Sequence, residues 1–104
     1  MSGAIDRKSG PLAIILMGSK ADAAHCQKIA SALSALGVES ETRIGSAHKT
    51  PAHVSGLLAA YEASGRPRVY ITVAGRSNAL SGYACGAVEA PVIACPPPSE
   101  AYGG

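Results

Sequence analysis

The sequence contains no tryptophan and no phenylalanine, and its only aromatic residues are four tyrosines. A folded core must therefore be built mainly from aliphatic side chains. Charged residues make up only 15% of the 104 residues and hydrophobic residues 47%, a balance that excludes an intrinsically disordered chain. The net charge of +2 is too small to indicate a nucleic-acid-binding protein, and the sequence has no basic stripe or aromatic platform for stacking bases.

Long hydrophobic runs are also absent, and none approaches the length of a membrane span. The run from Leu12 to Met17 follows Arg7 and Lys8, as in a signal peptide, but it is short and ends at Gly-Ser-Lys instead of a cleavage site. The cysteines are odd in number and lack metal-site spacing, which predicts reduced thiols: Cys26, Cys85 and Cys95. We therefore expect a cytoplasmic protein.

Apolar runs alternate with helical periodicity along the chain. Residues 1–11 are polar and small, and we expect a flexible lead-in to one domain over residues 12–104. Strands are predicted at Leu12–Met17, Val38–Ile44, Val69–Ala74 and Pro91–Cys95. Helices are predicted after Gly18–Asp22, ending at Gly37, and from Pro51 to Gly65, whereas residues 79–89 are expected to be weakly helical at best because Gly82 and Gly86 interrupt them.

Each predicted helix has one apolar face. In the first helix this face is formed by Cys26, Ile29, Leu33 and Leu36, and in the second by Val54, Leu57, Leu58 and Tyr61. Strands that alternate with helices give a parallel sheet with right-handed crossovers. The fold class expected is therefore α/β: a three-layer, flavodoxin-like parallel sheet of order 2-1-3-4, with helices on both faces.

In such a sheet, the loops that follow the first three strands all emerge at the carboxyl ends of the strands, where ligands bind. The second of these loops lies between Arg43 and Pro51. Thr50 and Pro51 form a helix start, and His48 and Lys49 precede it, so that a base and a cation adjoin an anion-binding helix end. This suits a phosphorylated substrate that exchanges a proton. Alternatively, it is an ordinary loop that contains a histidine and a lysine.

The other two loops carry weaker signals. In the first, Ser19 and Asp22 suit a phosphate and ribose hydroxyls, or else form a capping box that needs no ligand. In the third, Arg76, Ser77 and Asn78 follow a buried strand and suit a small anion, or else form a solvated turn.

The remaining histidines, His25 and His53, are interpreted as helix-face residues because no metal-binding trio can be assembled. Cys95 is interpreted as a buried thiol at the end of a strand, since no local partner is visible.

Taken together, the loops resemble the signatures of the phosphoribosylaminoimidazole carboxylase (AIR carboxylase) family of purine biosynthesis. The matching segments are Met17–Asp22, Ser46–Pro51, Ala74–Gly82 and Ala94–Pro97. The bacterial mutase class of this family, which moves a carboxyl group from the N5-carboxylated ribonucleotide, has Gly-Gly-Ala-Ala-His in the third loop. Here the loop reads Gly-Arg-Ser-Asn and Ala79 replaces the second histidine, so the sequence resembles the class that uses free carbon dioxide.

The resemblance implies a reaction and a site. Carbon dioxide would carboxylate 5-aminoimidazole ribonucleotide at C4, with His48 as the catalytic proton shuttle. Ser19, Ser46 and Lys49 would hold the 5′-phosphate, Asp22 the ribose, and Arg76, Ser77 and Asn78 the carbon dioxide pocket. The implied substrate-binding residues are Gly18, Ser19, Asp22, Ser46, Ala47, Lys49, Ala74, Gly75, Arg76, Ser77, Asn78 and Leu80. No cofactor is implied (no metal, biotin or ATP). The implied partners are the substrates and copies of the chain in a tetramer or octamer, with no nucleic acid and no membrane.

The sequence departs from the family pattern at two points. Ala21 replaces a second serine of the first loop, which removes one phosphate-binding hydroxyl. Family members also continue beyond the counterpart of Gly104, into a further strand and long helices. We therefore expect an exposed apolar patch or a tighter oligomer. Three alternatives to the carboxylase stay open: the mutase, a truncated ribonucleotide-binding relative without turnover, and a generic flavodoxin-like phosphate-binding module.

Overall fold

A computed structural model of the chain describes residues 10–45, 51–74 and 79–97. Four strands alternate with helices in the order that the sequence predicts. The elements are β1 (Leu12–Met17), the short 3-10 helix η1 (Lys20–Asp22), α2 (Ala23–Ala35), β2 (Glu39–Ile44), α3 (Pro51–Ser64), β3 (Arg68–Val73), α4 (Ala79–Ala87) and β4 (Val92–Ala94).

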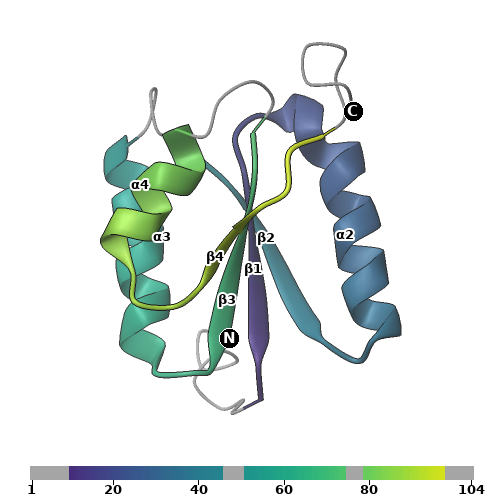
Figure 1. Cartoon of the computed structure of the whole chain (residues 1–104), viewed down its shortest axis with the longest axis horizontal. Coiled ribbons are helices and arrows are strands. Elements are labelled where there is room, and N and C mark those ends of the chain that lie inside the picture. Colours follow the sequence, from purple (N-terminus) through teal and green to yellow (C-terminus); the bar gives the residue numbers. More distant parts are fainter. Residues whose placement is uncertain (1–9, 46–50, 75–78, 98–104) are drawn as a thin grey trace.

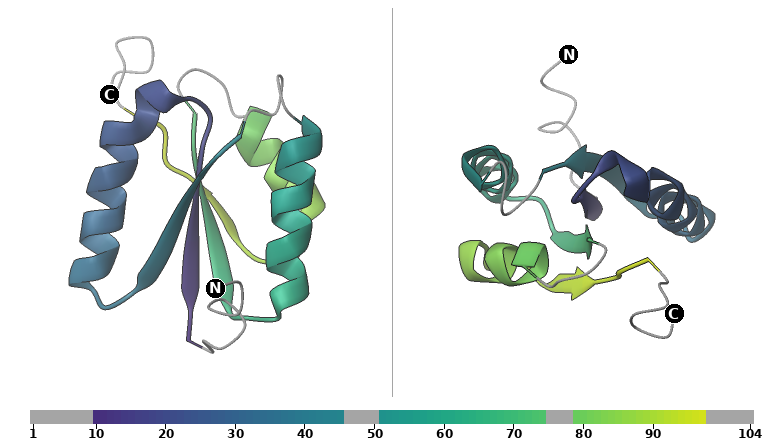
Figure 2. Two further views of the ribbon diagram at one scale, coloured as in Figure 1. Left: turned by 180° about the vertical axis from the view of Figure 1, so that it is seen from behind. Right: turned by 90° about the horizontal axis from the view of Figure 1, so that it is seen from above.

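The strands form one parallel sheet of order β2-β1-β3-β4, with the first strand of the chain in its interior (Figure 1). Seen from above, α2 lies on one face of this sheet and α3 and α4 lie on the other (Figure 2). The expected α/β class, strand order and covering of both faces are therefore confirmed. The alternating pattern of strands and helices carries this prediction, because it leaves few topologies open.

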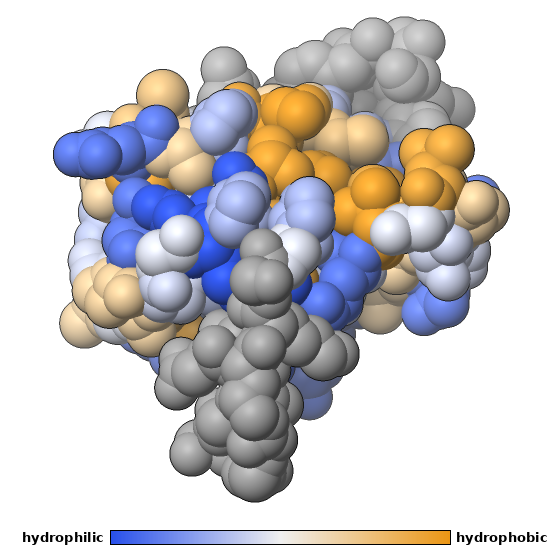
Figure 3. Space-filling view, turned by 90° about the horizontal axis from the view of Figure 1, so that it is seen from below, coloured by the Kyte–Doolittle hydropathy of each residue, from blue (hydrophilic) through white to orange (hydrophobic). Residues whose placement is uncertain are grey.

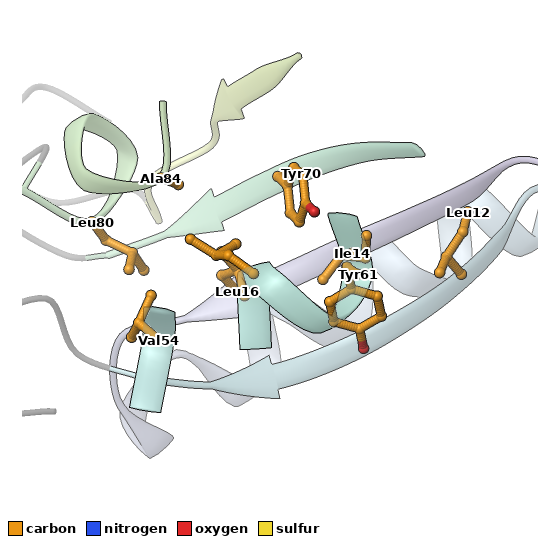
Figure 4. Packing of buried hydrophobic residues seen from close by; sticks show 9 residues of the cluster. Leu12, Ile14, Leu16, Val54, Tyr61, Tyr70, Leu80 and Ala84 are labelled. Atoms are coloured by element: carbon orange, nitrogen blue, oxygen red, sulfur yellow. The ribbon is translucent and has the colours of Figure 1, made fainter. Parts of the chain in front are cut away.

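Alternate residues of the central strands point into two separate cores. Leu12, Ile14 and Leu16 of β1 face α3 and α4, where they pack with Tyr61 and Tyr70 (Figure 4). On the opposite face, Ala13, Ile15, Ile71 and Val73 pack with Cys26 and the apolar face of α2. Because β1 is buried on both faces, its sequence is a continuous apolar run and does not alternate with polar residues.

Two details of the helices differ from expectation. α4 is a continuous helix of nine residues, although Gly82 and Gly86 were expected to interrupt it. Both glycines are exposed, whereas Leu80 and Ala84 are buried in the core, so packing of one face offsets the low helix propensity of glycine. Leu36 was expected on the buried face of α2, but it lies just past the end of the helix and is 77% exposed.

The glycines that end the first two helices have the conformation that this role requires. Gly37 has φ 79° and Gly65 has φ 72°, a left-handed backbone that side chains other than glycine rarely adopt. Each therefore stops its helix and returns the chain to the sheet.

Apolar side chains also reach the surface. The large exposed ones are Leu36, Ile44 and Ile93, and Ile93 of the edge strand β4 is 53% exposed. Viewed from below, apolar residues gather along one side of the molecule and hydrophilic residues occupy the middle (Figure 3). None of the helices in the described part of the chain has the length and hydropathy needed to cross a membrane.

Candidate functional site at the carboxyl edge of the sheet

The ends of β1, β2 and β3 lie side by side. Met17 is in register with Ile44 on one side and with Val73 on the other. The pairing continues one step into the loops, since the Gly45 amide donates to the Met17 carbonyl at 2.9 Å and the Gly18 amide to the Val73 carbonyl at 2.9 Å. The loops that follow these three strands therefore start at adjacent positions on one edge, as the sequence predicts.

In the first loop, Gly18 lies against the third, because a Cβ atom built on Gly18 would be 3.4 Å from the Cβ of Ala74. Ser19 caps η1, and its hydroxyl oxygen accepts a hydrogen bond from the Ala21 amide at 3.1 Å. Asp22 precedes α2 but makes no side-chain capping bond to it. The capping interpretation thus holds for Ser19, whereas the Asp22 carboxylate is left available at the start of a helix.

The second loop is described only at its two ends. Ser46, Ala47, His48 and Lys49, all named as site residues from the sequence, lie outside the described residues. At one end, a Cβ on Gly45 would lie only 2.7 Å from Cγ2 of the buried Val54, so this position accommodates only glycine without movement. At the other end, α3 begins at Pro51, as predicted.

The third loop leaves β3 at Ala74, which is half-buried. Gly75, Arg76, Ser77 and Asn78 lie outside the described residues. Leu80, in the first turn of α4, is 3% exposed and belongs to the core cluster that contains Val54, so its side chain contributes packing beneath the loop. The roles assigned to the residues of all three loops remain predictions.

Sequence reasoning missed two contacts close to this edge. His25 of α2 reaches the end of β4, where its Nε2 lies 3.2 Å from the carbonyl oxygen of Cys95 and 3.9 Å from the Cys95 thiol. Cys95 is half-buried. Its partner is His25, which the sequence did not reveal. The second contact joins Tyr83 of α4 to the start of α3. In both contacts the two partners are far apart in sequence, so no local sequence pattern indicates them.

Cys26, which follows His25 in the sequence, differs from Cys95 in its surroundings. Cys26 is buried, and burial, with a smaller contribution from the negative charge of Asp22, raises the pKa of its thiol. It is thus an unreactive core side chain. Within the described ranges, no group of three histidine, cysteine or acidic side chains is arranged to hold a metal ion.

The strongest charge pairs lie at the opposite, amino edge of the sheet. Arg68 donates to Glu62 at 2.5 Å, and the Tyr70 hydroxyl donates to the same carboxylate at 2.7 Å. The hydrogen bond from Arg68 is the largest cause that lowers the pKa of Glu62 to about 2. Burial and the neighbouring carboxylate raise the pKa of Tyr70. These groups are locked in their charge states and stabilise the fold rather than exchange protons.

Comparison with known proteins identifies the family. The family model for AIR carboxylase matches residues 12–104. A phosphoribosylaminoimidazole carboxylase of Treponema denticola is 58% identical over 94 residues, which cover 90% of this chain and 59% of that protein. One of Archaeoglobus fulgidus is 48% identical over 98 residues, which cover 94% and 53% respectively.

Solved structures agree with this comparison. The crystal structure of Treponema denticola PurE superposes with a TM-score of 0.87 at 58% identity, covering 90% of this chain and 60% of that one. The chain therefore spans little more than half the length of these three relatives. The matched segment includes all three loops of the candidate site and all four strands of the sheet. By sequence and by structure, the chain belongs to the AIR carboxylase family.

Proposed function

We propose that the protein carboxylates 5-aminoimidazole ribonucleotide at C4 with free carbon dioxide, a step of purine biosynthesis, and that in the reverse direction it acts as a carboxy-lyase. The observation that carries this proposal is the convergence of the three signature loops on one sheet edge in a chain of the AIR carboxylase family. A substrate with a phosphate, a ribose and a reactive ring needs contacts from separate segments, and the three loops begin side by side at this edge.

The carboxylation requires a base placed next to C4 of the substrate ring. The aminoimidazole ring is an enamine, and its C4 carbon forms a bond to carbon dioxide by donating the enamine electron pair. The adduct then loses the C4 proton, and the electrons of the C–H bond restore the aromatic ring. His48 would accept this proton, since imidazole titrates near neutral pH. Holding the reactants together would supply much of the rate enhancement.

Binding roles follow for the residues of the three loops, and two of these residues, Ser19 and Asp22, are described by the structure. The Asp22 carboxylate, which makes no capping bond, could accept hydrogen bonds from the ribose hydroxyls. Ser19, Ser46 and Lys49 would bind the 5′-phosphate near two helix starts, where backbone N–H groups favour anions. Arg76, Ser77 and Asn78 would stabilise the carboxylate that develops on carbon dioxide.

One residue favours the carboxylase over the mutase. Ala79 occupies the position at which the mutase class has its second histidine, and alanine has no group that can transfer a proton. The first residue of α4 therefore offers no second acid–base group.

The proposal is tested by offering the protein the two substrates separately. With 5-aminoimidazole ribonucleotide and dissolved carbon dioxide, we expect the C4-carboxylated product, detected by mass spectrometry. With the N5-carboxylated ribonucleotide, we expect only the slow product formation that follows its spontaneous loss of carbon dioxide. Faster turnover of the N5-carboxylated substrate would show the mutase. Tight ribonucleotide binding without product formation from either substrate would show a binding protein without turnover.

A further inference from the structure

The start of α3 is held from two sides by side chains. On the side of the sheet, Nε2 of His53 hydrogen-bonds to the carbonyl oxygen of Ile44, the last residue of β2, at 3.1 Å. On the side of α4, the Tyr83 hydroxyl donates to the carbonyl oxygen of Pro51 at 3.3 Å and also forms a short hydrogen bond with the hydroxyl of Ser55. Both contacts involve the first turn of α3, directly after the second loop.

Packing fixes the position of the Tyr83 hydroxyl. Leu80 and Ala84 lie on the same face of α4 as Tyr83 and are 3% and 0% exposed, in the core cluster that also contains Val54 and Leu58 of α3. The Tyr83 ring is half-buried against this cluster. A planar ring held in this way has few conformations, so its hydroxyl can fix the backbone that it contacts.

The Tyr83 contact joins the two helices that follow the second and third loops. α3 begins at Pro51, immediately after residues 46–50, and α4 begins at Ala79, immediately after residues 75–78. A bond between α4 and the first carbonyl of α3 therefore fixes the two helix starts relative to one another. Loss of this bond would leave the core in place but release the first turn of α3 on one side.

We propose that Tyr83 is a positioning residue for the carboxylation: its hydroxyl holds the first turn of α3, directly after the segment that carries His48 in the sequence, in register with α4. This inference rests on the proposed function. Tyr83 acts through the Pro51 carbonyl and the Ser55 hydroxyl and takes no part in proton transfer. Since proton transfer depends on placement to within a fraction of an ångström, a small displacement of the helix start lowers the rate.

The test is the variant Tyr83→Phe, which removes the hydroxyl and retains the ring. The matched control is Tyr70→Phe, because the Tyr70 hydroxyl also bonds to α3, through Glu62, but at the opposite edge of the sheet. Ser55→Ala removes the other member of the hydroxyl pair. In Tyr83→Phe we expect the amides of residues 54–58 to exchange hydrogen about fivefold faster, since one hydrogen bond that holds the start of α3 is lost. In Tyr70→Phe the amides of this first turn should exchange as in the wild type.

Kinetics then separate positioning from general stability. Tyr83→Phe should lower kcat about tenfold and raise the deuterium isotope effect on kcat, measured with ribonucleotide deuterated at C4, because proton removal becomes slower than the other steps. Tyr70→Phe should lower the melting temperature without changing kcat or the isotope effect. Ser55→Ala should show a smaller loss of kcat, and the double variant Tyr83→Phe/Ser55→Ala no more loss than Tyr83→Phe alone.

Two results would overturn the inference: a wild-type kcat and isotope effect in folded Tyr83→Phe, or equal losses in Tyr83→Phe and Tyr70→Phe. If the wild-type protein forms no product from the ribonucleotide, the proposed function fails separately. Hydrogen exchange then decides whether Tyr83 anchors α3, with unchanged exchange in Tyr83→Phe as the contradicting result.

Discussion

The two edges of the sheet differ in the kinds of residue they contain. At the amino edge, Arg66 is 4% exposed, donates to the Gly10 carbonyl at 2.8 and 3.0 Å, and pairs with Glu39 at 3.0 Å. Hydrophilic residues occupy the middle of the molecule when it is viewed onto this edge (Figure 3). At the carboxyl edge, Gly18, Gly45 and Ala74 lie at the strand ends.

The residues at the two edges of the sheet therefore have different roles. Charged side chains at the amino edge pair with one another and with backbone carbonyls, and so connect the ends of strands and helices. Only Nη1 of Arg66 is buried without a hydrogen-bond partner among the described residues. At the carboxyl edge, the described residues include small residues at the strand ends and helix starts, where backbone N–H groups favour anions. We therefore expect changes at the carboxyl edge to affect activity, and changes at the amino edge to affect stability.

The largest expected effect is that of His48→Asn at the carboxyl edge. Loss of the proton acceptor should lower kcat by about three orders of magnitude, while the dissociation constant of the ribonucleotide and the melting temperature stay within error of the wild type. Steady-state kinetics and calorimetric titration measure these quantities. His25→Asn, which changes a histidine of α2 on the other face of the sheet, is the control. If His48→Asn retained a normal rate, His48 would have no catalytic role.

The next largest effect is expected at the amino edge, in Glu62→Gln. This change removes the negative charge that accepts hydrogen bonds from Arg68, Tyr70 and the Glu89 amide, and should lower the free energy of unfolding by about 2 kcal/mol at pH 7. Chemical denaturation measures the loss, and kcat should not change. Glu89→Gln, at an exposed carboxylate, should alter the free energy of unfolding by less than about 0.5 kcal/mol. Equal losses in both variants would contradict the importance of this network.

The same carboxylate predicts how stability depends on pH. The pKa of Glu62 is about 2 in the folded protein and near 4.5 when the side chain is free, so the unfolded chain takes up the proton first as the pH falls. The contribution of ionised Glu62 to the free energy of unfolding is therefore complete above about pH 5, and it is lost progressively between pH 4.5 and 2. In denaturation series over this range, wild type and Glu62→Gln should converge towards equal stability. A constant difference between them would show that the folded pKa of Glu62 is not lowered.

The smallest expected effect comes from a pair of alanine substitutions at the carboxyl edge. In Gly45→Ala the new methyl group would lie 2.7 Å from Val54 Cγ2, and Val54 is buried and β-branched, so the start of α3 must shift. We expect a loss of about 1–2 kcal/mol and a lower kcat. In Gly18→Ala the methyl group would make ordinary contact with Ala74 at 3.4 Å, and the melting temperature should change little. Equal melting temperatures for the two variants would contradict the close contact at Gly45.

The sequence predicts the fold closely wherever the signal is local. The bounds of β1 agree with the prediction at both ends, since Leu12–Met17 is an apolar run between proline and glycine. β3 begins one residue earlier than predicted, at Arg68, which Glu62 of the preceding helix neutralises, and it ends one residue earlier, at Val73. The sequence predicts only weak helicity for residues 79–89, although Ala79–Ala87 forms a continuous helix. The core that stabilises this helix is formed by other elements, so the local sequence does not reveal it.

The site shows the same division. That three loops meet at one edge follows from the alternation of strands and helices, and the strand pairing confirms it. Which side chains anchor those loops does not follow, because Tyr83 meets Pro51 across 32 positions and His25 meets Cys95 across 70. The roles of His48 and of Arg76–Asn78 depend on their motifs and remain predictions.

The interior position of β1 has a consequence for the order of folding. Of the four strands, β1 leaves the ribosome first, yet its pairing with β3 needs residues that are synthesised more than fifty positions later. Until then only β2 can pair with it, and its apolar side chains lack the partners from β3, α3 and α4. Such distant pairings are slow to form. One face of β1 therefore stays uncovered in the nascent chain until α3, β3 and α4 have been synthesised, and binding by a chaperone during that interval would raise the yield of folded protein.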